Sequence, residues 1–434
     1  MPGVPTSRRW SALAHRDFRI YWAGQAISLV GTWMQQVAQG WAVSSLTTRN
    51  GTLALVSLVA SIPMVGLSLA GGAAADRHSR RDILIVTQVL LAAVAFVYGA
   101  LVWTNHLTMV GVFCLALVTG VVIAYDLPAQ SALTPELVPA QDIPSAIALN
   151  QSIFHGARLI GPFVAGVVMA ATSTAFAFFA NGASYFAVVA SLLLIRPPAR
   201  RLAPPPAGLE AIRDGVDYVR RHPVLLPLMG FTALVCAFVF PFAVVFPPLF
   251  VRAALGADEA GLGTFMAAGG LGALTGALVL VAIAPEHRGR TLVLTSLLIA
   301  SALAGLSFAR GLAQAVPLVA LLSFGTSTGL GLAGTLIQII VPNELRGRVM
   351  SIQGLMFTGL MPAAGFAAGL AADHSSLRLV MRGGAALFLV TALPWLVRAG
   401  WWRLHDLTAL AADAAADAPD SPSSQRSLLH ERTA

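Results

Sequence analysis

Long apolar runs limit what this chain can fold into. Runs of roughly twenty residues with few or no charges recur from one end to the other, and a helix of about that length crosses a bilayer. Only 11% of the residues are charged, against about 25% in soluble domains. In lipid, backbone polar groups must be hydrogen-bonded within the protein, so only helices or a closed barrel can span. Barrel strands would alternate over about ten residues, so the sequence predicts an all-α integral membrane protein.

The apolar runs divide into twelve predicted transmembrane helices. They are Phe18–Leu46, Leu53–Ala75, Ile83–Trp103, Thr108–Asp126, Ile143–Ala171, Ala175–Ile195, Val224–Phe250, Gly261–Ala284, Thr291–Phe308, Ala313–Val341, Val349–Ala371 and Ser376–Val397. With an even number of spans, both termini lie on one side. Of the 27 arginines, 21 fall on that side, five on the other, and Arg158 within a span. Positive loops stay cytoplasmic, so we expect a multi-pass protein of the bacterial inner membrane with both termini in the cytoplasm.

A proline- and arginine-rich stretch, residues 196–206, divides the spans into two groups of six. We therefore expect a cytoplasmic N-terminus (1–17), two six-helix bundles (18–195 and 224–402), a cytoplasmic linker (196–223) and a disordered tail (403–434). In the linker, Leu209, Ile212, Val216 and Val219 recur at helical spacing, which predicts an amphipathic surface helix. A shift of 203 residues superimposes Gly156 on Gly359 and Gly166 on Gly369, as parallel six-span repeats would.

A charged signature follows the second span. It reads Gly72-Ala73-Ala74-Ala75-Asp76-Arg77-His78-Ser79-Arg80-Arg81. A glycine lets helices pack closely, an acid ends the span, and arginines mark the cytoplasmic face. The segment resembles the loop signature of the major facilitator superfamily, G-x-x-x-D-R-x-G-R-R, with Ser79 replacing a glycine. The resemblance implies the major facilitator fold, and a charge network of Asp76, Arg77, Arg80 and Arg81 that holds the cytoplasmic gate closed. The alternative is a plain positive-inside loop.

Asp126 is predicted near the cytoplasmic end of the fourth span. A carboxylate at a membrane boundary needs a cation or water. The resemblance implies that Arg77 or Arg80 pairs with Asp126 and so completes the gating network; a hydrated acid at a helix end is the alternative. No buried acid for carrying protons is evident in the spans, so proton coupling is implied by the resemblance alone.

The fifth span contains Gly161-Pro162 followed by Gly166. Proline removes a backbone hydrogen bond and kinks a helix, and small neighbours permit tight packing. The segment resembles the antiporter signature of drug-exporting members of the superfamily, although alanine occupies two of the family's glycine positions, 157 and 165. Importers generally lack this signature, so the resemblance implies efflux. A generic structural kink is the alternative.

Polar side chains within two spans predict a substrate cavity. Arg158 lies mid-span, where a cation is costly and is expected to face a cavity; it could receive an anionic substrate or lock helices through carbonyls or Asn150. Gln151 and His155 share its helical face, and His155 either titrates near neutral pH or is a neutral hydrogen-bonding residue. The first span adds a stripe, which is either a cavity wall or interhelical contact. The stripe comprises Gln25, Ser28, Thr32, Gln35 and Gln39.

Four stretches place the chain nearer one branch of the superfamily. Phe18–Trp33, Asp126–Pro139, Ala146–Val167 and Val341–Ile352 resemble the drug:proton antiporter-like branch that includes the enterobactin exporter and related secretion permeases. The resemblance implies export of a siderophore, another metabolite or drugs; an importer of the same fold is the weaker alternative. We expect a functional monomer with a small-molecule substrate, and no nucleic-acid partner.

The sequence offers no pattern for catalysis. It contains no phosphate-binding loop and no zinc-type histidine pair, and its Ser, His and Asp residues show no convergent nucleophile and base. Cys114 and Cys236 both lie in apolar runs, which argues against a disulfide or a metal site. We therefore expect a transporter without cofactor, metal or catalytic residues.

Overall fold

The computed structural model describes residues 10–195 and 209–398, and every regular element in these ranges is helical. The first half of the chain forms α1 (Arg16–Leu46), α2 (Asn50–Gly66), α3 (Ser68–Arg77), α4 (Arg80–Trp103), α5 (Met109–Leu133), α6 (Ile143–Ala171) and α7 (Thr174–Leu194). Three 3-10 turns accompany them: η2 (Ser11–Ala14), η3 (Thr134–Leu137) and η4 (Ala140–Asp142). Ser79 caps α4, because its hydroxyl accepts a hydrogen bond of 3.3 Å from the backbone N–H of Asp82.

The second half begins after α8 (Leu209–Arg221), which occupies the stretch where the sequence predicts an amphipathic helix. It comprises α9 (Leu225–Phe238), η5 (Pro241–Val245), α10 (Pro247–Leu249), η6 (Phe250–Ala254), α11 (Glu259–Ala282), η7 (Pro285–His287), α12 (Arg288–Phe308), α13 (Leu312–Ile340), α14 (Asn343–Leu355), η8 (Met356–Leu360), α15 (Met361–His374) and α16 (Leu377–Arg398). The elements η5, η6 and η8 are single π-helical turns, which insert an extra residue and often occur at functional positions.

Among the described residues, eight helical segments are long and apolar enough to cross a membrane. Two bent pairs raise the number to ten: α2 with α3, bent by 47°, and the end of α8 with α9, bent by 108°. The long helices α1 and α16 contain 31 and 22 residues and could each cross about 30 Å of hydrocarbon. The twelve predicted spans are consistent with this arrangement if both cross.

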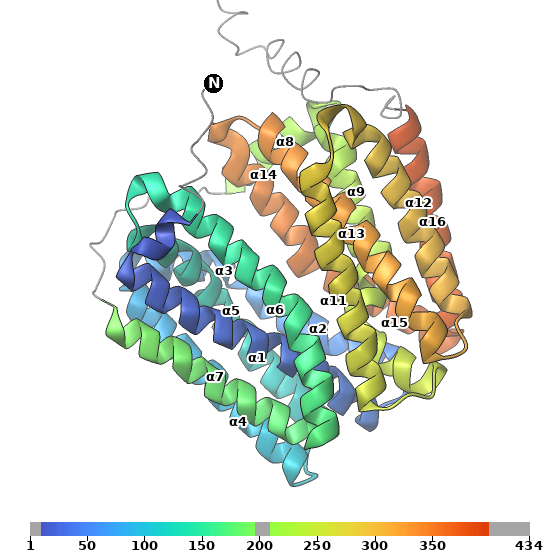
Figure 1. Ribbon diagram of the computed structural model, residues 1–434, viewed down its shortest axis with the longest axis horizontal. Helices are drawn as coiled ribbons and strands as arrows, with labels where there is room; N and C mark the ends of the chain where they lie inside the picture. Colours follow the sequence, from blue (N-terminus) through green and yellow to red (C-terminus); the bar gives the residue numbers. More distant parts are fainter. Residues whose placement is uncertain (1–9, 196–208, 399–434) are drawn as a thin grey trace, which may run out of the picture.

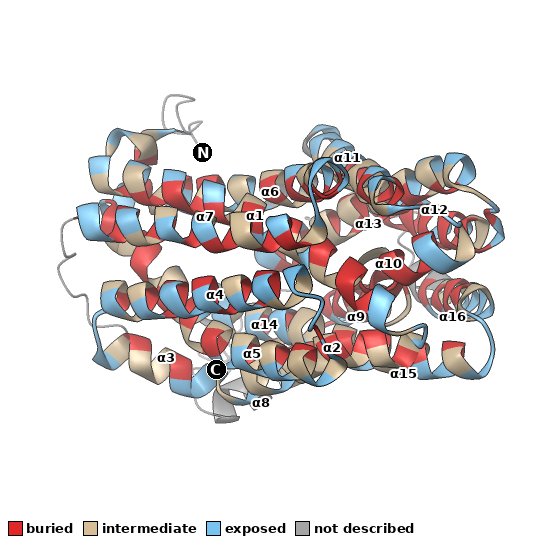
Figure 2. Cartoon of the chain, turned by 90° about the horizontal axis from the view of Figure 1, so that it is seen from below, coloured by how far each residue is buried: buried red, intermediate tan, exposed pale blue. Residues whose placement is uncertain are grey.

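Apolar side chains cover the outside of the helical bundles. Ile62 is 63% exposed, Leu278 64% and Val390 69%. Figure 2 shows the buried residues on the inward faces of the helices and the exposed ones on the outward faces. A water-soluble protein rarely exposes so much apolar surface, so this surface fits contact with lipid tails.

The two halves form two helical bodies that meet at one end (Figure 1). The principal contacts between them join α6 to α11 and α2 to α15. We call this the closed end; it comprises residues 44–51, 166–174, 252–263 and 369–373. Toward the other end, which carries residues 76–81, the halves diverge in Figure 1, and α3, η3 and η4 make their principal contacts within their own half. We call that the motif end.

Candidate functional site

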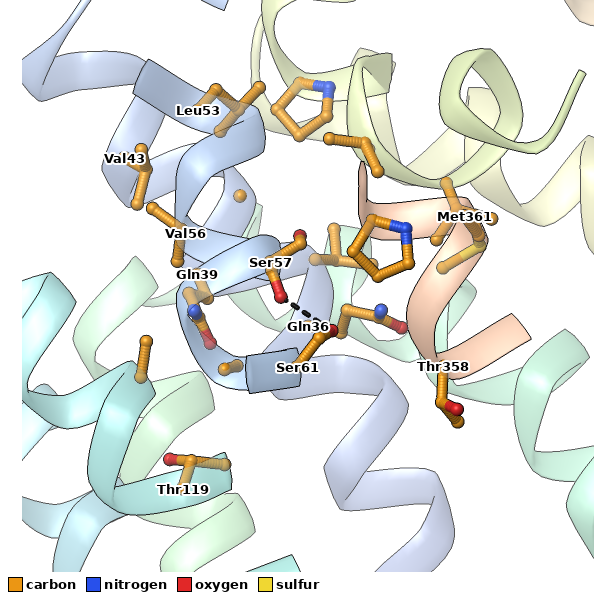
Figure 3. Close-up of a pocket in the computed structure, with 18 of the residues that line it drawn as sticks. Gln36, Gln39, Val43, Leu53, Val56, Ser57, Ser61, Thr119, Thr358 and Met361 are labelled. Carbon is orange, nitrogen blue, oxygen red and sulfur yellow. Dashed lines mark hydrogen bonds between the residues drawn. The ribbon is translucent and has the colours of Figure 1, made fainter. Parts of the chain in front are cut away.

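A cavity of about 350 Å³ lies between the two halves, just inside the closed end. The first half lines it from α1, α2 and α5, and the second half from η5, α10, α11, η8 and α15. Figure 3 shows side chains of both halves pointing into it, including Gln36, Ser57 and Met361. Its size falls within the range of small-molecule sites, about 300–1,000 Å³. A cavity shared by two halves changes shape whenever they move relative to each other.

The cavity lining is mostly apolar, carries a few polar groups and has no charged side chain. Its polar groups are amides and hydroxyls, from Gln36, Gln39, Ser57, Ser61, Thr119 and Thr358. Three methionines and Phe357 supply soft apolar surface, which adapts to ligands of different shape. Such a lining suits an amphipathic molecule with hydrogen-bonding groups.

The predicted polar stripe on α1 separates into two roles. Gln39 lines the cavity, together with its neighbour Gln36, which the spacing argument missed. The other members bond within the first half: Gln35 Oε1 accepts from Asn181 Nδ2 at 2.7 Å, and Gln25 Nε2 donates to Tyr21 Oη at 2.7 Å. Thr32 Oγ1 donates to the Ser28 carbonyl at 3.0 Å. Both alternatives, cavity wall and interhelical contact, therefore occur along one helix.

Arg158 lies between the two halves and is not among the residues that line this cavity. Its guanidinium carbon is 5.5 Å from the ring centroid of Trp33 on α1 and 5.6 Å from that of Phe240, just after α9. Asn150 Nδ2 donates to Thr134 Oγ1 at 2.9 Å, and Asn150 Oδ1 has no hydrogen-bond partner, so Asn150 does not serve as the predicted partner of Arg158. Gln151, two turns away on α6, is exposed, and the side chain of His155 lies outside the described ones. The aromatic contacts stabilise the cation at the boundary between the halves.

The predicted pairing of Asp126 with an arginine is wrong for this structure. The carboxylate oxygen Oδ1 accepts hydrogen bonds from Thr87 Oγ1 at 2.5 Å and Gln88 Nε2 at 3.0 Å, both on α4. Arg80 forms its ion pair with Glu136 in η3, and Arg80 Nε also donates to the Ala75 carbonyl at 3.3 Å. The reason is that α5 continues to Leu133, so Asp126 lies about two turns inside the helix and is only 6% exposed.

The other charges of the motif lie at the same end. Arg81 Nε donates to the Leu192 carbonyl at 2.6 Å, in the last turn of α7. A cation at that position satisfies a terminal carbonyl and complements the helix dipole. Asp76 is half-buried and Arg77 exposed at the C-terminus of α3. All four motif charges and Glu136 therefore belong to the motif end of the first half.

The sequence predicts that Gly72 packs closely against a neighbouring helix, but the glycine that does so is Gly71. A Cβ atom added at Gly72 would meet nothing within 4 Å, whereas one at Gly71 would collide with the backbone of Ala124 and Tyr125 on α5. The two other predicted glycines do pack closely. Gly161 faces the backbone of α1 at Val30 and Met34, and Pro162 beside it is buried within α6, which continues past it as one helix.

Gly71→Ala should therefore destabilise the first half, and Gly72→Ala should not. Adding a methyl group against the backbone of a neighbouring helix lowers the free energy of unfolding by about 1–3 kcal/mol, because a backbone cannot move aside as a side chain can. Thermal unfolding of the purified protein, followed by tryptophan fluorescence, measures the difference. Equal melting temperatures for the two variants would show that α3 and α5 do not pack as described.

The closed end is held by contacts across the two halves. Gly166 approaches the backbone of Gly263, and Gly369 approaches Asn50 and Gly51, so the two glycines matched by the 203-residue shift both lie at inter-half contacts. The carboxylate of Asp373, on α15, accepts from the backbone N–H groups of Asn50 at 2.6 Å and Gly51 at 3.0 Å. It therefore caps the N-terminus of α2 from the opposite half.

A second set of contacts joins α1 and α7 to the start of α11. Glu259 Oε1 accepts hydrogen bonds from Trp41 Nε1 at 2.7 Å and from Thr174 Oγ1 at 3.2 Å. Arg252 lies over the Trp41 ring, with its guanidinium carbon 5.1 Å from the centroid. Glu259 and Asp373 were not predicted from the sequence, where their only signal is an acidic side chain at a helix end on the side with few charges.

Ser11, His15 and Asp142 meet at one carboxylate, a contact that the sequence did not predict. Ser11 Oγ donates to Asp142 Oδ1 at 2.6 Å, and His15 Nε2 lies 2.8 Å from Asp142 Oδ2. Ser11 and His15 bind different oxygens of the same carboxylate, so the contact does not place the His15 imidazole on the Ser11 hydroxyl. It holds η2 against the start of α6. In the described ranges, no group of three or more His, Cys, Asp or Glu residues could hold a metal ion.

Comparisons with known proteins identify the class. The family described as transmembrane secretion effector matches residues 7–422. The chain is 26% identical to the enterobactin exporter EntS of Citrobacter koseri over 393 residues, which cover 87% of this chain and 91% of that protein. It is 23% identical to the macrolide efflux protein A of Streptococcus pyogenes over 370 residues, covering 82% and 89%.

A solved structure supports the same fold. The bacterial homologue of the human lysosomal transporter spinster, in an inward-facing and unoccupied conformation, superimposes with a TM-score of 0.63 at 15% identity, covering 95% of this chain and 98% of that one. The family match spans nearly the whole chain, and the two-body helical architecture agrees with it. The chain therefore belongs to the transmembrane secretion effector family of the major facilitator superfamily.

Proposed function

We propose that this protein exports an amphipathic small molecule from the cytoplasm across the bacterial inner membrane by alternating access. The observation that carries the proposal is the position of the cavity: both halves line it, beside the end where they are in contact. If the halves rock about this cavity, it faces the motif end in one state and the closed end in the other.

The direction and orientation follow from separate observations. The arginine bias supports a cytoplasmic motif end with both termini inside. In that orientation the described state is closed to the outside. The Gly161-Pro162 segment and the exporting relatives support efflux. Proton import as the driving step is carried over from the resemblance to the superfamily, and a monomer is the functional unit in this proposal. In this proposal residues 18–195 and 224–402 are the moving bundles, and Asp76, Arg77, Arg80 and Arg81 help to close the motif end.

Two kinds of cargo fit the site. Arg158, held between two aromatic rings at the boundary of the halves, favours a molecule with an anionic group, such as an iron-chelating metabolite. The uncharged, methionine-containing cavity instead favours varied amphipathic drugs. We place metabolite export first because a fixed cation in the membrane is costly to retain without a use.

The test compares a deletion strain, the same strain carrying the wild-type gene, and one carrying Arg158→Met. Intracellular and secreted metabolites are measured by mass spectrometry under iron limitation, and growth is measured across a panel of toxic compounds. An iron chelator trapped in the deletion strain and in Arg158→Met supports metabolite export. Altered drug sensitivity with unchanged metabolites supports the second candidate. No difference in either measurement rejects export.

Asp373→Ala should open the closed end. The change removes the acceptor of two backbone N–H groups of the opposite half, and losing such a cap costs about 0.5–2 kcal/mol, or up to about 30-fold in population. Spin labels at Thr172 and Arg310, both exposed and on different halves, report the separation.

Asp258→Ala is the matched control for this variant. Asp258 caps α11 through a bond of 2.9 Å to the backbone N–H of Gly261, within its own half. Asp258→Ala therefore removes a helix cap without removing a contact between the halves. If both variants lengthen the distance between the labels equally, the Asp373 contact is not what holds this end closed.

A further inference from the structure

A buried carboxylate lies inside the first half, where none was expected. Asp126 is 6% exposed, and its two hydrogen-bond donors, Thr87 and Gln88, are both neutral and both buried. An ionised carboxyl group in such a place is costly without a cation, whereas the neutral acid is readily accommodated. The site therefore differs from a structural ion pair such as Arg80 with Glu136.

The groups around Asp126 are neutral as well. Among the described residues, its electrostatic partners are the phenols of Tyr21 on α1 and Tyr185 on α7. The segment of α2 packed against α5 contains no titratable residue, and α3 carries its charges, Asp76 and Arg77, at its last turn, beyond the contact at Gly71. On α4, the nearest cations in sequence are Arg81, which donates to the Leu192 carbonyl, and Arg80, which is paired with Glu136.

An unused hydrogen-bond acceptor lies beside the carboxylate. Gln88 is 3% exposed, and its Oε1 atom has no hydrogen-bond partner, although its Nε2 atom donates to Asp126. A buried acceptor without a donor costs about 1–3 kcal/mol. If Asp126 were protonated, a half-turn of the Gln88 amide would let Oε1 accept from the new O–H group. The pair can therefore satisfy either protonation state.

A line of polar side chains runs from this site toward the cavity. Tyr185 Oη lies 3.5 Å from Thr32 Oγ1, and Thr32 is exposed. Gln36, one helical turn further along α1, lines the cavity. Polar side chains of α1 and α7 therefore lie between the region of Asp126 and the cavity.

We propose that Asp126 is the proton-binding site that couples proton import to export, an inference that rests on the proposed function. A proton from water forms an O–H bond with a carboxylate oxygen and changes the charge of the site from −1 to 0; release returns the proton to water on the other side. Because the neutral acid tolerates a dry bundle and the carboxylate does not, protonation biases the equilibrium between the two states of the transporter.

The test uses the purified full-length protein in lipid nanodiscs and needs no cargo. Infrared difference spectra between acidic and alkaline pH record the C=O band of protonated carboxyl groups, and the Thr172 and Arg310 spin labels record the closed end at each pH. We expect Asp126→Asn to lose one component of that band and the pH response of the distance. Asp142→Asn removes a second buried carboxylate in the same half and should keep the pH response of the distance.

Each outcome decides the proposal. An unchanged band in Asp126→Asn shows that Asp126 does not titrate, and a lost component with an intact pH response shows that its titration is not coupled; either overturns it. If Asp126→Asn folds poorly, Asp126→Glu takes its place in the test. It retains an acid, so the distance between the labels should still respond to pH, with a displaced midpoint. Because this experiment uses no cargo, its result can be interpreted even if the export assay fails. A negative result here likewise leaves the export assay interpretable.

Discussion

Gly166→Leu should abolish transport while leaving the two halves folded. A Cβ atom at Gly166 would lie 2.5 Å from the Cα atom of Gly263 on the opposite half, where the contact is backbone against backbone. Leucine cannot fit there unless α6 and α11 separate. Overpacking costs about 1–3 kcal/mol or more, and 3 kcal/mol corresponds to a population change of about 150-fold. In this variant the two halves should therefore stay apart at the closed end. The cargo identified by mass spectrometry should no longer be exported.

Gly156→Leu provides the matched control on the same helix. A Cβ atom at Gly156 would meet nothing within 4 Å. Spin labels at Thr172 and Arg310 should move apart in Gly166→Leu and keep the wild-type distance in Gly156→Leu. An unchanged distance in both variants would mean that α6 and α11 do not form the contact that closes this end.

The 203-residue shift matched these glycines correctly in pairs. Gly156 and Gly359 both have open space at the Cβ position, and Gly166 and Gly369 both meet the backbone of the other half. The internal repeat therefore reflects a structural symmetry in which the α6–α11 and α2–α15 contacts are counterparts. Composition and spacing were sufficient for this, because close helix contacts in membranes depend on small residues.

The sequence could not predict which charges pair. The fourth span is predicted to end at Asp126, but α5 continues through Pro128 to Leu133, because prolines are tolerated inside membrane helices. That extension buries Asp126 and brings Glu136, three residues beyond Leu133, to Arg80. A pairing between a loop and a helix depends on where each element ends, and element ends are the least predictable feature of a sequence.

The choice between neighbouring residues was equally inaccessible. Gly71 and Gly72 differ by one step around α3, and that step of about 100° decides which one faces α5. Likewise Gln35 bonds to Asn181 while Gln36 lines the cavity. A stripe of polar residues predicts that a helix has a polar face. Only the packing of the neighbouring helices determines which of these residues line the cavity and which bond to another helix.

Glu136→Gln should be the most destabilising single change at the motif end. Arg80 is 9% exposed and Glu136 6%, so the substitution takes the carboxylate from a buried guanidinium. Breaking a buried ion pair costs about 3–5 kcal/mol. The exposed pair of Glu286 and His287, 3.8 Å apart, is the control, and Glu286→Gln should change stability by less than about 1 kcal/mol. Thermal unfolding of the purified variants compares the two changes.

The double variant Arg80→Met/Glu136→Leu separates stability from gating. Well-packed apolar residues can replace a buried ion pair at little cost in stability, so its melting temperature should recover much of the loss seen in Glu136→Gln. If the pair also helps the motif end to close, the stable double variant should still export poorly. A variant with both stability and export restored would show that the pair only holds η3 against α4, and that closure depends on Asp76, Arg77 and Arg81. Either result shows which charged residues of the motif end take part in its closure, which the resemblance to a family signature does not show.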